Sequence, residues 1–367
     1  MGYGWLLSAA LAAALASWAF DALVRLVWRP RAVARRLRAQ GVRGPGYGFF
    51  HGNLRDIRRL RAAGAGVRLG VADHDFTPIA QPQFREWVPR YGRVFLYWYL
   101  PTEKNRRVWK LDKEVRTTLT KIIKNRLAAK EKAGYGNDLL GLMLEACAPE
   151  HGGDQLLSMD EIIDECKTFF FAGQETTSHL LTWAMFLLST HPDWQDKLRE
   201  EVRRECGDRD RAPTHDMLNK LKLMNLFILE TLRLYSPVPL IRRRTRTAVE
   251  LGGIVVPEDA ILTLPIATMH RDREVWGEDA GEFNPLRFDA GVTKTAPKNL
   301  GALLAFSSGP RSCIGQNFAM VEARAVVAAI LQRFELTLSP EYVHAPTDVI
   351  TLRPKYGLPM IVTSAGA

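Results

Sequence analysis

A long, capped helical pattern in the middle of the chain constrains its fold more than any other feature. Ser158 and Glu161 form an S-x-x-E capping box, which is typical of a helix N-terminus. The pattern continues to Thr190 and is expected to end at His191-Pro192, because the residue before a proline disfavours the helical conformation. A helix over Met159–Thr190 would be about 48 Å long. The chain must therefore build a domain large enough for one helix to cross it.

Helical patterns outnumber strand patterns in the rest of the chain. Tyr91–Trp98 is rich in aromatic residues and Val, and Val249–Leu264 alternates and turns, so both segments predict short strands. Together with the helices, they predict a mainly α fold with minor β. Further helices are expected over Lys104–Lys132, Asp193–Cys206 with Pro192 near its start, His215–Tyr235 and Gln316–Arg333.

The positive charge of the chain is concentrated in one segment. The formal net charge is +10, and Arg29–Arg68 holds eleven arginines, no lysine and a single acid, Asp56, so the rest of the chain is nearly neutral. Nucleic-acid binding would need basic residues on a folded face with stacking aromatics, whereas these arginines directly follow an apolar segment. We therefore expect no nucleic-acid partner. The four cysteines are widely spaced without a C-x-x-C pair, which argues against a disulfide framework or a zinc site.

The N-terminal segment is apolar and uncharged. Gly2–Phe20 has nineteen residues without a charge, and as a helix it would span about 28 Å, close to the hydrocarbon core of a bilayer. The alternatives are a buried helix and a cleaved signal peptide, but a signal peptide carries its positive charge before the apolar run, and here the arginines follow it. We expect a membrane anchor over residues 2–28, a basic linker with a Pro/Gly hinge over 29–50, and one large domain over 51–367, which the positive-inside rule places in the cytosol.

The segment F-S-S-G-P-R-S-C-I-G, which ends at Gly315, combines the residue types that a haem-thiolate site requires. A thiolate ligand needs donors around its sulfur, a cation for the haem propionates and shielding from water. Gly309 and Gly315 allow backbone N–H groups to approach the sulfur of Cys313, and a helix after Cys313 points its positive end toward it. Arg311 is the candidate propionate partner and Phe306 the candidate shield. A buried cysteine at a loop–helix junction is the simpler alternative.

The F-x-x-G-x-R-x-C-x-G spacing resembles the cysteine motif of the cytochrome P-450 family and is highly specific to it. The resemblance implies a haem-thiolate monooxygenase of that fold, with heme b as cofactor and Cys313 as the axial iron ligand. Two more motifs follow the family's order: Glu230 and Arg233 form an E-x-x-R pair, and Arg287 lies in F-N-P-L-R-F, which is similar to the family's P-x-R-F segment. The resemblance implies that these three residues form a structural triad behind the cysteine loop, whereas E-x-x-R alone would fit a surface ion pair.

A fourth motif, A-G-Q-E-T-T, lies within the long predicted helix. Gly173 costs about 1 kcal/mol there relative to Ala, which favours a kink or a close approach. Thr176 alone would fit a hydroxyl bonded back to the carbonyl four residues earlier. The family resemblance instead assigns Thr176 and Glu175 to ordering water and delivering protons for dioxygen activation. It also places a propionate-binding arginine near Arg243, with the two neighbouring arginines as alternatives.

The chain departs from the family pattern in its first half. It is on the order of 150 residues shorter than is usual for the family, and the deficit falls near Trp98–Tyr99, where the family has helices that cover the haem and line the substrate entrance. One of those helices carries a W-x-x-x-R motif, and none of the nine tryptophans here has an arginine four residues later. A skipped exon, a gene-model error or a decayed copy would explain the deficit. We hypothesise that the chain holds haem poorly, because missing walls leave apolar surface in water.

Lys220–Arg233 and Ala305–Arg324 resemble plant enzymes that hydroxylate brassinosteroid side chains and inactivate the hormone. The residues themselves predict only a small apolar substrate that arrives from the membrane, with Thr347–Leu352 and Ser236–Ile241 as pocket walls. The resemblance implies electrons from an NADPH-dependent cytochrome reductase, and a location in the endoplasmic reticulum membrane. Two alternatives stay open: a membrane-anchored, non-catalytic remnant, and a soluble cysteine-nucleophile enzyme, which the lack of a histidine near Cys313 disfavours.

Overall fold

The computed structural model describes residues 16–17, 20, 24, 28–45, 53–64, 82–91, 105–130, 134–147, 157–207, 212–292 and 301–365. The predicted anchor Gly2–Phe20 lies almost entirely outside these residues, and the predicted junction at Trp98–Tyr99 lies wholly outside them. Among the described helices, none combines the length and the apolar character needed to cross a bilayer. The anchor and the domain boundaries therefore stay predictions.

Helix α9 (Met159–Thr190) begins and ends at the predicted residues. The capping box is formed: the Glu161 backbone N–H donates to Ser158 Oγ at 3.3 Å, and the Ser158 backbone N–H donates to Glu161 Oε2 at 2.7 Å. Both bonds satisfy N–H groups that lack a partner within the helix. At the other end His191 leaves the helical conformation, and α10 (Pro192–Cys206) begins with its proline at the first position.

The C-terminal half of α9 lies in the largest hydrophobic core among the described residues, and we call the region built around this core the main body, or body. Trp183, Phe186 and Leu187 are fully buried there. Trp183 stacks on Tyr235 with ring centroids 4.3 Å apart, and its indole N–H donates to the Leu352 carbonyl at 2.9 Å. Its large apolar surface is therefore buried without leaving a polar atom unsatisfied. The core also includes residues of α10, α12 (Lys222–Leu234), α16 (Gln316–Leu331) and β5 (Phe334–Leu338).

The helix predicted over residues 215–235 is broken at Leu221 into α11 (His215–Lys220) and α12. Leu221 has a ψ of 81°, which lies outside the helical region. The buried carboxylate of Glu201, on α10, accepts two backbone N–H groups from the first turn of α12, at 2.8 and 2.9 Å. It therefore caps α12 and places a negative charge at the positive end of that helix.

The described strands form four small antiparallel pairs, which agrees with the predicted mainly α fold with minor β. The pairs are β1 (Ile241–Arg244) with β4 (Ile261–Leu264), β2 (Val249–Leu251) with β3 (Ile254–Val256), β5 with β8 (Met360–Ser364), and β6 (Pro346–Asp348) with β7 (Leu352–Pro354). The predicted strand region Val249–Leu264 holds the strands β2, β3 and β4, and four short helices among the described residues lie between β4 and α16. The short helices are α13 (Ile266–Met269), α14 (Arg273–Trp276), η3 (Pro285–Phe288) and η4 (Gly309–Arg311).

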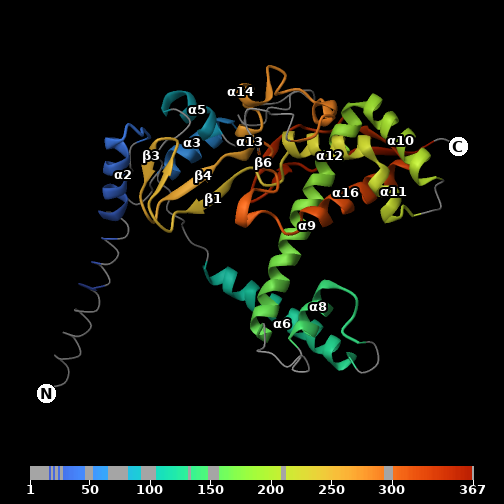
Figure 1. Cartoon of the computed structure of the whole chain (residues 1–367), viewed down its shortest axis with the longest axis horizontal. Helices are drawn as coiled ribbons and strands as arrows, with labels where there is room; N and C mark the ends of the chain where they lie inside the picture. Colours follow the sequence, from blue (N-terminus) through green and yellow to red (C-terminus); the bar gives the residue numbers. More distant parts are fainter. Residues whose placement is uncertain are drawn as a thin grey trace.

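The end of the body that carries β1 to β4 lies beside the helices α2 (Arg29–Ala39), α3 (Leu54–Gly64) and α5 (Pro82–Tyr91), which precede residue 92 (Figure 1). The side-chain amide of Gln40 exchanges two hydrogen bonds with the backbone of Val255 in β3, at 2.9 and 2.7 Å. Arg61 forms an ion pair of 3.0 Å with Asp348 in β6. Tyr91 ends a helix, so the predicted strand does not begin there, and its other residues lie outside the described chain.

The N-terminal half of α9 leaves the body and packs with two other helices, α6 (Asn105–Ala128) and α8 (Leu139–Ala146); we call this region the arm (Figure 1). Exposed ion pairs support it, with Arg116 of α6 contacting both Asp160 and Asp164 of α9 at 2.6 and 3.1 Å. Its buried apolar cluster is small. The members described are Ile123, Leu144, Ile162 and Ile163.

Candidate haem-thiolate site

Cys313 is carried by a loop that folds back on itself before α16. Its backbone N–H donates to the Phe306 carbonyl at 2.8 Å, which closes the loop. Ser307 and Gly309 have φ angles of 61° and 75°, and at the second position only glycine adopts this conformation without strain. A Cβ added at Gly309 would meet nothing within 4 Å, so the backbone conformation of the turn, and not lack of space, favours glycine there. The predicted approach of its N–H group to the sulfur stays a prediction.

The sulfur of Cys313 lies beside the start of α16 and is exposed. A Cβ added at Gly315 would lie 3.9 Å from Cys313 Sγ, so Gly315 lies close to the sulfur. Gly315 precedes the first residue of α16, whose N-terminus receives no side-chain cap. Its backbone N–H groups therefore favour a negative charge nearby, such as a thiolate. Two adjacent apolar side chains, Ile314 and Phe318, are 89% and 74% exposed.

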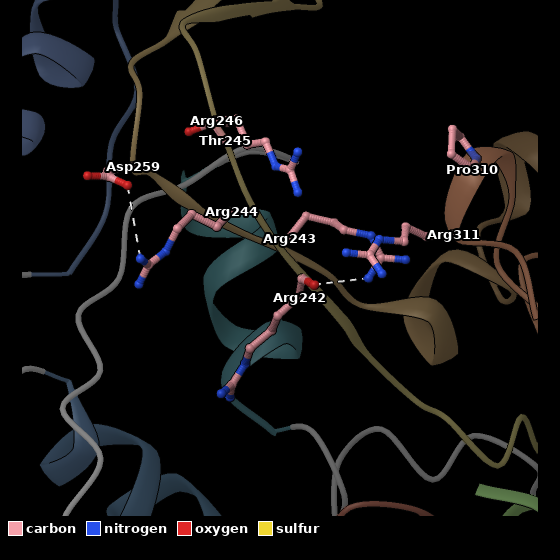
Figure 2. A pocket seen from close by; sticks show the side chains of 8 residues that line it. All are labelled: Arg242, Arg243, Arg244, Thr245, Arg246, Asp259, Pro310 and Arg311. Carbon is pink, nitrogen blue, oxygen red and sulfur yellow. Dashed lines mark hydrogen bonds and ion pairs between the residues drawn. The ribbon is translucent and has the colours of Figure 1, made fainter. Parts of the chain in front are cut away.

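An open cavity of about 950 Å³ lies beside this loop and is lined by arginines (Figure 2). Arg243 connects its two walls, because its guanidinium donates to the Ser307 hydroxyl at 3.1 Å. One acid, Asp259, lines the cavity and lies 4.0 Å from Arg244. The excess of positive charge suits a ligand with more than one carboxylate. The cavity is lined by Arg242, Arg243, Arg244, Thr245, Arg246, Asp259, Pro310 and Arg311.

The three predicted triad residues lie together. Glu230 and Arg233 are fully buried and form two parallel bonds of 2.7 Å each. Arg287 approaches the Glu230 carboxylate at 3.8 Å, but its closest acidic partner is Asp279, at 2.7 Å. Its guanidinium holds the pKa of the Asp279 carboxyl below its ordinary value. Sequence reasoning missed Asp279, although an acid eight residues before Arg287 is a signal that could have found it.

The A-G-Q-E-T-T motif places Gly173, Glu175 and Thr176 on one turn of α9. The Thr176 hydroxyl donates to the Ala172 carbonyl at 2.7 Å, which is the simpler of the two predicted arrangements. This bond uses the only hydroxyl proton and leaves the oxygen able to accept another. Glu175 Oε1 accepts from the Thr351 hydroxyl at 3.4 Å, which connects the turn to the predicted pocket wall. A Cβ added at Gly173 would meet nothing, so the space above this turn is open.

The donor set fits heme b on the thiolate side. An exposed sulfur stands at the N-terminus of a helix, arginines line an adjacent cavity where two propionates could bind, and the chain just after the cysteine carries two exposed apolar side chains. These are the features of a haem-thiolate protein. The particular family follows from comparison with known proteins: the Cytochrome P450 family model matches residues 83–358, and the chain belongs to the cytochrome P450 family of monooxygenases. Members of this family use heme b iron with a cysteine thiolate as axial ligand, and Cys313 stands at that place in the motif.

Several curated plant proteins are similar to the chain. Cytochrome P450 709B1 of Arabidopsis thaliana is 32% identical over 499 residues, which cover 94% of this chain and 95% of the relative. Cytochrome P450 709B3 of the same plant is 51% identical over 269 residues, and cytochrome P450 734A6 of rice is 46% identical over 283 residues. These two alignments cover 73% and 74% of this chain, but only 51% and 52% of the relatives. The chain therefore matches about half the length of these last two proteins.

Proposed function

We propose that this chain derives from a monooxygenase that hydroxylates a small apolar molecule, a plant hormone of the brassinosteroid type, and that its haem site is now covered mainly from the thiolate side. The cationic cavity beside the exposed Cys313 carries this proposal, because it offers the propionate partners and the ligand together. The substrate class is supported by the resemblance of Lys220–Arg233 and Ala305–Arg324 to brassinosteroid-inactivating hydroxylases. An NADPH-dependent cytochrome reductase at the endoplasmic reticulum membrane is the electron donor that we propose.

The proposed internal deficit is supported by the alignment with cytochrome P450 709B1. Because 94% of 367 residues is about 345, this chain fills only part of the 499 aligned positions and leaves about 150 without a residue. The same alignment covers 95% of the relative, so the unfilled positions lie largely inside it. We place them near Trp98–Tyr99. The exposure of Phe170 and Phe171 on α9, at 74% and 49%, is the surface expected where covering helices are missing.

Each site residue has a proposed task. Cys313 holds the iron, Arg243 and Arg311 hold the propionates, and Phe306, which packs against the main core, fixes the start of the loop. Heme b supplies the oxygen-activating chemistry when it is bound. Glu175 and Thr176 order water and pass protons, since a carboxyl group and a free acceptor lone pair lie on one helical turn.

A second candidate function follows from the arm. A membrane-anchored, non-catalytic remnant would expose the same apolar side chains of α9 and would also lack the tryptophan–arginine motif noted above. The two candidates differ in one property that can be measured, which is the fraction of chains that bind haem through a thiolate.

Haem titration of the expressed full chain separates the candidates. We expect less than one haem per chain, with a red-shifted thiolate Soret band in the reduced carbon-monoxide adduct. Cys313→Ser should abolish that band, whereas Cys147→Ser, a partly buried cysteine at the end of α8, should keep it. Full stoichiometry would contradict the open site, and a thiolate band that survives in Cys313→Ser would overturn the ligand assignment. No thiolate band in the unaltered chain would favour the remnant.

A further inference from the structure

His270 lies between the buried triad and the segment that leads to the cysteine loop. Its side chain is fully buried, with 0% exposure. Nδ1 lies 3.1 Å from the backbone carbonyl oxygen of Arg233, and Nε2 lies 2.9 Å from the backbone nitrogen of Leu304. Because a backbone N–H can only donate, Nε2 must be the acceptor, so Nδ1 carries the proton and donates to Arg233. The geometry thus fixes one neutral tautomer.

The contact with the triad runs in both directions. The Arg233 guanidinium donates to the backbone carbonyl of His270 at 2.9 Å, and it also donates to the Glu230 carboxylate. His270 and Arg233 therefore hold each other through two bonds, one from each side chain to the other backbone. A rotation of the imidazole would break its bond to Arg233 and its bond to Leu304 together.

The contact with the loop runs through two residues. The carbonyl of Leu304 accepts from the Ser307 backbone N–H at 2.9 Å. The carbonyl of Phe306, the residue before Ser307, accepts from the Cys313 backbone N–H at 2.8 Å. The first bond closes the turn that contains Ser307, and the second closes the cysteine loop. Because His270 binds the backbone nitrogen of Leu304, it fixes the position of the residue that leads into the cysteine loop.

We propose that His270 is a positioning residue that joins the buried triad to the loop carrying Cys313 and holds that loop in position. The role in haem binding rests on the proposed function, but the positioning of the loop is measurable without haem. Burial and the nearby cations of Arg233 and Arg271 lower the pKa of His270 to about 3, which keeps the ring neutral and Nε2 able to accept. Sequence reasoning missed this residue, because a single histidine beside a short helix carries no pattern.

Three substitutions separate positioning from space filling. In His270→Gln, the amide oxygen can take the place of Nε2 and accept from Leu304. In His270→Asn, the shorter amide reaches only the Nδ1 position, so it keeps the donor to Arg233 and loses the acceptor. His270→Leu keeps most of the volume and loses both bonds. His344→Leu is the matched control, since His344 is also buried and bonds Tyr342 at 2.7 Å within the main core.

Hydrogen exchange on the full chain without haem is the primary measurement. We expect exchange in residues 301–315 to rise on the order of tenfold in the Asn and Leu variants, as for the loss of one buried hydrogen bond, with little change in α10. The Gln variant should restore most of the protection, and His344→Leu should not loosen this loop selectively. Unchanged exchange in His270→Leu, or an equal rise in α10 and the loop in all His270 variants, would overturn the proposal.

Haem titration of the same variants gives a spectroscopic readout. Where the unaltered chain forms the thiolate adduct, His270→Asn and His270→Leu should shift it toward the blue-shifted form that lacks a thiolate, and His270→Gln should retain it. Retention of the full thiolate band in His270→Leu would count against the proposal. If the unaltered chain forms no thiolate adduct, the proposed function fails, and the exchange comparison still decides whether His270 positions the loop.

Discussion

The two halves of α9 lie in regions with very different packing. In the body, the helix buries Trp183, Phe186 and Leu187 in a core shared with α10, α12 and α16. In the arm, four buried apolar residues form the described core, and the supporting ion pairs are exposed. The same helix is therefore stabilised by burial at one end, while at the other it depends on weak surface contacts. Among the described residues, the buried apolar core of the body is therefore much larger than that of the arm.

The candidate site lies where these two regions meet. Cys313 and the triad belong to the body, and their contacts are satisfied within it. Thr176 and Glu175 lie at the turn where α9 leaves the body and its side chains become exposed. Within the described residues, the thiolate side of the candidate site is therefore held by the packed body, whereas the turn that carries Thr176 and Glu175 is only partly buried.

Glu230→Ala should destabilise the body most. It leaves the Arg233 guanidinium buried without its carboxylate, and breaking a buried ion pair in this way costs about 3–5 kcal/mol. The free energy of unfolding, from urea titration followed by circular dichroism, measures the loss. Arg273→Ala is the control, because Arg273 and Glu278 form an exposed pair at 3.3 Å and its loss should cost about 0.5 kcal/mol or less. Equal effects of the two substitutions would show that the triad does not stabilise the body.

Leu187→Ala should come next, and Ile163→Ala is its counterpart in the arm. Leu187 is fully buried in the main core, so its truncation should cost about 2–5 kcal/mol of unfolding free energy. Ile163 is also buried, but in the small cluster, so its truncation should raise hydrogen exchange in α6 and α8 and leave the urea midpoint of the body unchanged. If Ile163→Ala shifted that midpoint as far as Leu187→Ala, the two regions would unfold as one and the comparison would fail.

The sequence predicted elements whose signals are local. Ser158 with Glu161 marks the start of α9, His191-Pro192 marks its end, and both bounds are as expected. The pairing of Glu230 with Arg233 was also predictable, because residues three apart share a helix face. In each case, the interacting groups lie within one or two helical turns of each other in the chain.

Features that depend on distant residues escaped prediction. The break at Leu221 is capped by Glu201, from a different helix, so no local pattern shows it. His270 acts through Leu304, thirty-four residues later. Arg243 donates to Ser307, sixty-four residues later in the chain, and its role as a propionate partner stays a prediction. These contacts are tertiary, and tertiary contacts override local preference.

Acid should destabilise the body through His270. Its folded pKa of about 3 lies below the ordinary value of 6.5, so the folded state binds fewer protons than the unfolded state between these two values. The stability contributed by neutral His270 is therefore present above pH 6.5 and is lost as the pH falls toward 3. At 1.36 kcal/mol per pH unit, about 2 kcal/mol should be lost by pH 5.

The matched variant for this pH dependence is His270→Gln, which has no titrating ring. The difference in urea midpoint between pH 7 and pH 5 should be smaller in this variant than in the unaltered chain. Asp279 does not contribute to this difference between pH 7 and pH 5. Its pKa is lowered in the folded state, so the stability that it contributes is lost only as the pH falls through its folded pKa, below 3.8. Identical slopes in the two proteins would show that His270 is not buried in the neutral form.

Ser158→Ala should affect the arm alone and by a smaller amount. It removes the side-chain acceptor for the Glu161 backbone N–H, and loss of such a cap costs about 1 kcal/mol. Exchange in the first two turns of α9 should rise several-fold, while residues 180–190 of the same helix stay protected. Ser189→Ala is a control in the body half, where the hydroxyl only donates to the Met185 carbonyl four residues earlier. A rise in exchange along the whole of α9 would mean that the arm and the body share one cooperative unit.

Phe170→Gln with Phe171→Gln should have the smallest effect on stability, and it tests the exposure of the arm most directly. Both side chains are exposed, so replacing them should change the free energy of unfolding by less than about 0.5 kcal/mol. Self-association, followed by light scattering against protein concentration, should fall because an apolar patch is removed. Leu286→Gln is the control, since Leu286 is a 56% exposed apolar side chain on the body, and individual exposed apolar residues are ordinary on protein surfaces. If the double substitution instead destabilised the protein by more than about 1 kcal/mol, the two phenylalanines would be covered in solution. The arm would then have a partner, and the contrast with the body would no longer hold.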